Sequence, residues 1–122
     1  MFRLWAKEFK DNRMLRDIVI EDNRIKEYID YIIENNIKSV YLCNLYFKNT
    51  NIDFLEKINF VEKLNITSSG IKNYDVLHTL NNLSYLSIEE VESVLNLEKS
   101  TWLKELSLSM SNKVKGIEYL TN

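Results

Sequence analysis

Proline is absent from the 122 residues, and there are only two glycines, one cysteine and one histidine. A single cysteine cannot form an internal disulfide, which excludes a disulfide-stapled secreted scaffold and favours a reducing compartment. One cysteine and one histidine cannot build a structural zinc site, and the carboxylates show no calcium-loop spacing. A glycine-rich phosphate-binding loop is also missing. We therefore expect neither a metal nor any other cofactor.

The chain also lacks a strong charge bias and a long apolar run. Its formal net charge is −2, so no overall basic field is present that would attract nucleic acid or anionic lipid. Charges interrupt residues 1–10, unlike a signal peptide, and no window approaches the ~20 apolar residues of a membrane span. With 45% hydrophobic residues, the sequence predicts one cytoplasmic domain that binds neither nucleic acid nor membrane. Its many Asn, Ile and Lys residues favour a bacterial origin.

What the sequence does contain is a repeated hexad with the pattern apolar-x-x-apolar-x-apolar. It occurs five times, and successive hexads begin 22, 24, 22 and 20 residues apart. We number the positions of each hexad from one to six and call the next residue position seven. The apolar residues are Leu15, Ile18 and Ile20; Ile37, Val40 and Leu42; Val61, Leu64 and Ile66; Leu83, Leu86 and Ile88; and Leu103, Leu106 and Leu108.

This pattern resembles the leucine-rich-repeat family, with short bacterial-type units of about 22 residues and a strand segment L-x-x-L-x-L-x-x-N/C-x-L. The resemblance covers residues 15–122 and implies an α/β leucine-rich-repeat solenoid. A short parallel sheet would form its concave face, and helices or turns its convex face. The competing interpretation is an α+β domain in which strands and helices alternate by coincidence. The third unit fits best, through Val61, Leu64, Ile66, Ser69, Ile71, Tyr74, Leu77 and Leu80.

The family's ladder asparagine is matched in the first unit only. Asn23 stands at that position, whereas the later units carry Leu45, Ser69, Val91 and Ser111 there. We therefore do not count on an asparagine ladder, and we expect irregular coil between strands.

Each hexad predicts a short strand that starts at position three or four, with positions four and six facing inward. The segment after each strand must return the chain. Residues 25–34 have helical spacing and predict a true helix. Residues 52–58 and 74–80 predict helical turns, and 91–97 a mostly irregular segment. The helix should bury Ile25, Tyr28, Ile29, Ile32 and Ile33.

The two ends of the array differ. Residues 1–14 form an N-terminal cap segment in our interpretation, because Phe2, Leu4, Trp5 and Phe9 alternate with charges and would cover the first strand. Residues 15–122 form an array of about five units, and no such cover follows Leu108. We therefore consider three alternatives: the chain is a fragment of a longer array, it associates with another molecule through the C-terminal edge, as in homo-association, or a local turn closes this end.

A catalytic site needs a nucleophile, a base and an anion-binding feature in one pocket. His78 lies on a return segment and Cys43 at a strand end, and both are expected to be ordinary packed or surface residues. The acidic cluster Glu89, Glu90 and Glu92 is typical of a solvated surface. The sequence therefore predicts a protein that is not an enzyme and has no catalytic residues.

The outward face of the sheet is the best candidate site. Positions two, three, five and seven form columns of mixed charge that include two tyrosines, and tyrosine on a rigid surface is a favoured interface anchor. The predicted partner-binding residues are Arg16, Asp17, Lys38, Tyr41, Lys63, Asn65, Tyr85, Ser87, Glu89, Lys104 and Glu105.

The sequence thus predicts a protein–protein interaction module that binds another protein, whose identity it does not give. A narrower hypothesis is a bacterial immunity or inhibitor protein that occupies a partner through the concave face. The alternatives are a structural protomer or fragment that self-assembles through its C-terminal repeat, and an enzyme with an unrecognised site.

Overall fold

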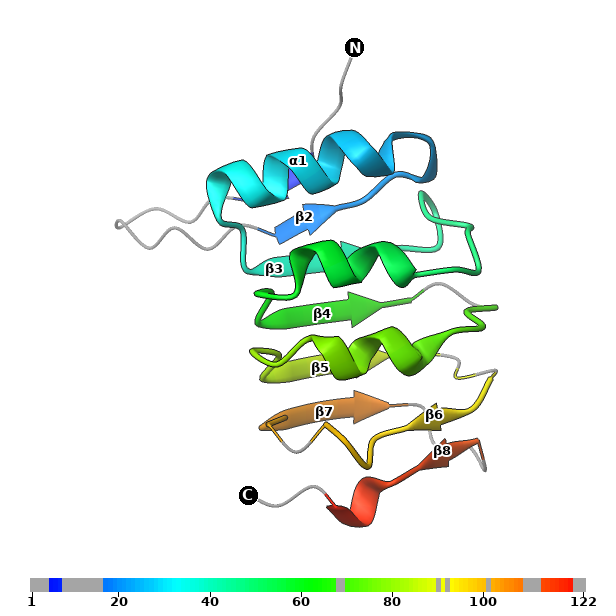
Figure 1. Ribbon diagram of the computed structural model, residues 1–122. Coiled ribbons are helices and arrows are strands. Elements are labelled where there is room, and N and C mark those ends of the chain that lie inside the picture. The colour runs from blue at the N-terminus through cyan, green and yellow to red at the C-terminus, as the bar shows by residue number, and fades with distance from the viewer. Residues whose placement is uncertain are drawn as a thin grey trace.

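The chain is an α/β protein with a short, mostly parallel sheet and few helices. The computed structural model describes residues 5–7, 17–67, 70–89, 91, 93–100, 102–108 and 113–119; for 5–7, Asp17 and Tyr119 it describes the backbone alone. The strand order in the six-stranded sheet is β1-β2-β3-β4-β5-β7, which is also the order along the chain (Figure 1). The strands are β1 (Trp5–Lys7), β2 (Asp17–Val19), β3 (Ser39–Leu42), β4 (Lys63–Ile66), β5 (Tyr85–Ile88) and β7 (Glu105–Leu108).

The five parallel strands all begin at position three of a hexad, as predicted. Neighbouring strands pair without any slip in register, so position four of each hexad lies directly beside position four of the next. Because side chains alternate between the two faces of a strand, one row of apolar residues runs along the same face of the sheet. The predicted alignment is therefore confirmed for Ile18, Val40, Leu64, Leu86 and Leu106.

One face of this sheet is covered by the segments that return the chain (Figure 1). The first return contains the short 3-10 helix η1 (Asp22–Arg24) and the helix α1 (Ile25–Asn35), which matches the predicted helix. It ends at Asn36, whose left-handed backbone (φ 52°) lets its N–H reach the last carbonyls of the helix. Tyr28, Ile29 and Ile32 are buried, Ile25 is partly buried against the core, and Ile33 is half exposed, so the buried face of the helix is narrower than predicted.

The next two returns are the predicted helical turns, and both are 3-10 helices. These are η2 (Asp53–Ile58) and η3 (Tyr74–Thr79). The fourth return was expected to be mostly irregular, but it contains the two-residue strand β6 (Leu95–Asn96). β6 pairs in parallel with β8 (Val114–Lys115), so a second, two-stranded sheet forms in the return layer.

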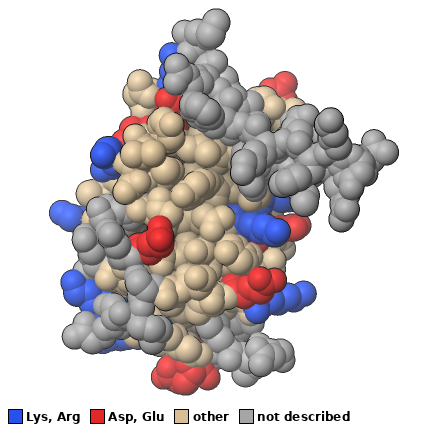
Figure 2. Space-filling view, turned by 180° about the vertical axis from the view of Figure 1, so that it is seen from behind, with Lys and Arg blue, Asp and Glu red and all other residues tan. Residues whose placement is uncertain are grey.

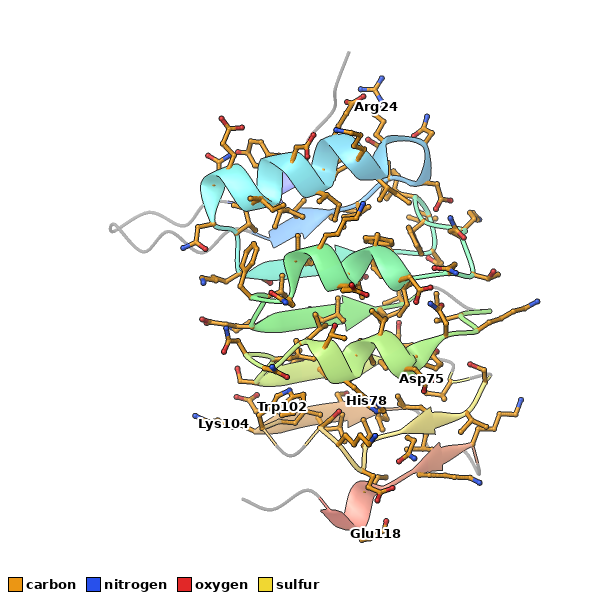
Figure 3. All side chains as sticks on the ribbon, in the orientation of Figure 1. Arg24, Asp75, His78, Trp102, Lys104 and Glu118 are labelled. Atoms are coloured by element: carbon orange, nitrogen blue, oxygen red, sulfur yellow. The ribbon has the colours of Figure 1, made fainter. Side chains whose placement is uncertain are left out.

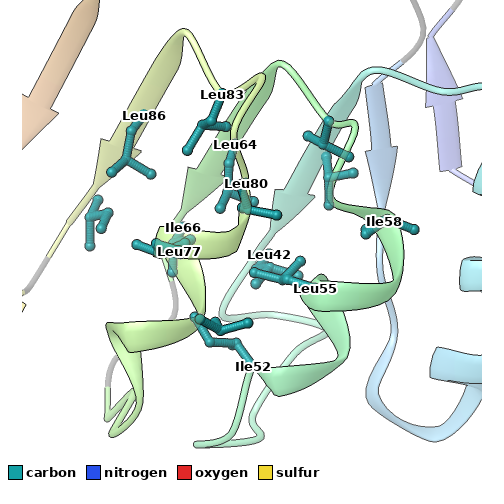
Figure 4. Packing of buried hydrophobic residues seen from close by; sticks show 14 of the residues in the cluster. Leu42, Ile52, Leu55, Ile58, Leu64, Ile66, Leu77, Leu80, Leu83 and Leu86 are labelled. Atoms are coloured by element: carbon teal, nitrogen blue, oxygen red, sulfur yellow. The ribbon is translucent and has the colours of Figure 1, made fainter. Parts of the chain in front are cut away.

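The core lies between the main sheet and the return layer. Leu64 and Ile66 of β4 belong to the same core cluster as Leu55 and Leu77 from the returns on either side, and Figure 4 shows Ile66 beside Leu77. Positions four and six of the first four units are at most 1% exposed, and each of the four returns that lead from one parallel strand to the next contributes buried apolar residues as well. Each unit therefore shares its core with its neighbours, as expected where a single unit is too small to bury its own apolar side chains.

The two ends of the main sheet are built differently. At one end β1 pairs antiparallel with β2, with Ala6 beside Ile18; the rest of the expected cap segment 1–14 lies outside the described residues. At the other end, β8 and the 3-10 helix η4 (Ile117–Tyr119) extend the return layer beyond β7. Gly116 between them has φ 83°, and a Cβ there would lie only 2.9 Å from the Leu97 nitrogen. Glycine is required at this turn by both conformation and space.

The longest helix in the described part of the chain, α1, has 11 residues. No helix there is long and apolar enough to cross a membrane.

Candidate functional site

The candidate site is the outward face of the main sheet, the side opposite the return layer. Two rows of side chains cross it at right angles to the strands, because strands in register align equivalent positions. The position-three row contains Ser39, Lys63, Tyr85 and Glu105, and the position-five row contains Val19, Tyr41, Asn65, Ser87 and Ser107.

Nine of the eleven predicted partner-binding residues are described with their side chains, and all nine lie on this face or at its margins. Tyr41, Lys63, Asn65, Tyr85, Ser87 and Glu105 stand on the strands, Lys38 and Lys104 directly before a strand, and Glu89 directly after one. Asp17 joins the position-three row through its backbone, opposite Ser39, and its side chain is outside the description. Arg16 lies outside the described residues altogether.

A hydrogen-bond pattern that recurs in successive units joins the strands of this face at their starts. The carbonyl oxygen at position two accepts bonds from the N–H groups at positions two and three of the next unit. Lys38 accepts in this way from Glu62 and Lys63 at 2.8 and 3.0 Å, and Ser84 from Lys104 and Glu105 at 2.8 and 2.9 Å. A backbone fixed at both ends of each strand presents the side chains of this face in a set geometry.

Tyr41 and Tyr85 stand out among the polar side chains of the face. Tyr41 lies beside Asn65, and Tyr85 lies beside Lys63. One strand separates the two tyrosines, and Tyr85 stands two residues nearer the strand starts, so their Cα atoms are about 12 Å apart at the usual strand spacing and rise. Both residues are partly exposed, whereas their inward neighbours Val40, Leu42 and Leu86 are buried. Two such rings on a rigid surface can be buried by a partner at low entropic cost.

Charges on this face gather at the starts of the strands. Lys38, Glu62, Lys63, Lys104 and Glu105 all lie there, with both signs mixed. The Lys38 ammonium sits over the Phe60 ring, 5.3 Å from its centroid. The position-five row carries no charge, and Figure 2 accordingly shows a continuous uncharged area across the middle of this face. A partner that fits must therefore present uncharged side chains to the middle and polar ones to the margin.

His78 and Cys43, the two residues considered as catalytic candidates, lie on different elements of the structure. His78 lies on η3 in the return layer (Figure 3), and its Nε2 is 2.9 Å from the backbone oxygen of Asn96. Cys43 follows β3, partly buried, with its Sγ 3.9 Å from the side-chain oxygen of Asn44. Within the described ranges, no three His, Cys, Asp or Glu side chains come close enough together to hold a metal ion.

Sequence reasoning missed a set of polar side chains that link neighbouring units behind the strand ends. Asn73, directly before η3, accepts a bond from the Ile52 N–H at 2.9 Å and donates to the side chains of Asn51 and Asp53. Asp22 accepts from the N–H groups of Lys48 and Asn49 in the next unit.

The sequence does carry a pattern that could have revealed these links. Asn51 and Asn73 are 22 residues apart, which is the repeat spacing, and each precedes a return helix. The links are not made by the residues at the position that the family pattern assigns to the ladder asparagine. These linking residues hold the return layer together and lie away from the outward face.

A scan against models of protein families found no match to this chain, and no curated protein and no solved structure proved similar to it.

Proposed function

We propose that the chain is a leucine-rich-repeat solenoid whose outward sheet face binds another protein. Five hexads in unbroken parallel register support the repeat interpretation, because each unit contributes one strand and one return to the same two layers. All the described returns lie on one side of the sheet, and no described segment covers the other side of its five parallel strands (Figure 1).

The observation that carries this proposal is a pair of partly exposed tyrosines on the outward face, with Tyr41 in the uncharged position-five row and Tyr85 between Lys63 and Glu105 in the position-three row. Position-five residues in the middle of the sheet are neither buried nor charged, and polar residues border them on the side of the strand starts. Protein interfaces share this arrangement of an uncharged centre with aromatic anchors and a polar rim.

Replacing both tyrosines by alanine tests the proposal. The chain, its Tyr41→Ala/Tyr85→Ala variant and a Tyr31→Ala control are each immobilised and used to isolate partners from the native host. Tyr31 is a suitable control because it is a partly exposed tyrosine on α1, in the layer away from the outward face. A partner retained by the wild-type chain and the control, and lost by at least tenfold in the double variant, supports the proposal. Equal retention by all three chains rejects it, and so does the failure of any partner to bind.

Within this class we propose a narrower role, a bacterial immunity or inhibitor protein that blocks its partner by covering it. A preformed surface suits such a role, because little ordering is needed when the partner binds. Co-expression with the product of the neighbouring reading frame tests it. Protection of the cells from a toxic product, abolished by the double tyrosine variant, is the expected result. A neighbour that is harmless and does not co-purify would remove this narrower role and leave the general one standing.

A further inference from the structure

We draw no further inference here: the strongest candidate, the apolar surface at the outer side of β7 where Leu106 and Leu108 are only partly buried, carries nothing, because nothing in the described part of the structure shows what covers it.

Discussion

The two faces of each strand in the main sheet have opposite character although their residues alternate in the chain. In β4, Leu64 and Ile66 are fully buried, whereas Lys63 is exposed and Asn65 is partly exposed. The inward rows contain only leucine, isoleucine or valine in every unit, while the residue types in the outward rows differ from unit to unit. The inward side therefore sets the register and the stability, and the outward side can vary without changing the fold.

The largest effect on stability is expected when an inward side chain in the middle of the sheet is truncated to alanine. Leu64→Ala should lower the free energy of unfolding by about 2–5 kcal/mol, because it leaves a cavity between β4 and the returns. Leu106→Ala, at the same position of β7, should cost about half as much, since its side chain is already partly exposed. Urea unfolding at low protein concentration measures both. Equal losses would show that β7 is as well covered as the middle of the sheet.

Much of this architecture could be predicted from the sequence, because the hexads encode it locally. Apolar residues at positions one, four and six fixed the strand starts, and their recurrence fixed the row of Ile18, Val40 and Leu64. The outward rows follow from the same register, so the candidate face could be predicted residue by residue. Helical spacing predicted α1 in the same way, apart from the exposed Ile33.

What could not be predicted depends on contacts between units. β6 and β8 are only two residues long, and they form because stacking brings Leu95 beside Val114, so neither segment carries a strand pattern of its own. The position of Lys38 over Phe60 likewise depends on how the turn before β4 folds back. The links made by Asn73 were missed because the family pattern directed attention to a different position.

A smaller loss is expected from cutting those links between units. Asn73→Ala removes the acceptor of the Ile52 N–H and the donor to Asn51 and Asp53, so it should cost about 1–2 kcal/mol of unfolding free energy. Asn59→Ala, at the exposed end of η2, is the matched control and should change stability by less than about 0.5 kcal/mol. A loss no greater than that of the control would mean that apolar stacking alone holds the return layer.

The smallest effect on stability is expected on the outward face, where tyrosine can be compared with tyrosine. Tyr28 is fully buried in the return layer, and its hydroxyl donates to the Glu21 carboxylate at 2.6 Å. Its replacement by alanine should cost about 3–5 kcal/mol. Tyr41→Ala and Tyr85→Ala remove partly exposed side chains from the surface of the sheet, so each should cost less than about 1 kcal/mol of unfolding free energy. Urea unfolding of the three variants decides the matter. If replacing the outward tyrosines lowers the free energy of unfolding as much as replacing Tyr28, their rings contribute mainly to packing, and the main support for a binding role of this face is removed. If their removal leaves the fold intact, any loss of binding in the same variants belongs to the interface itself.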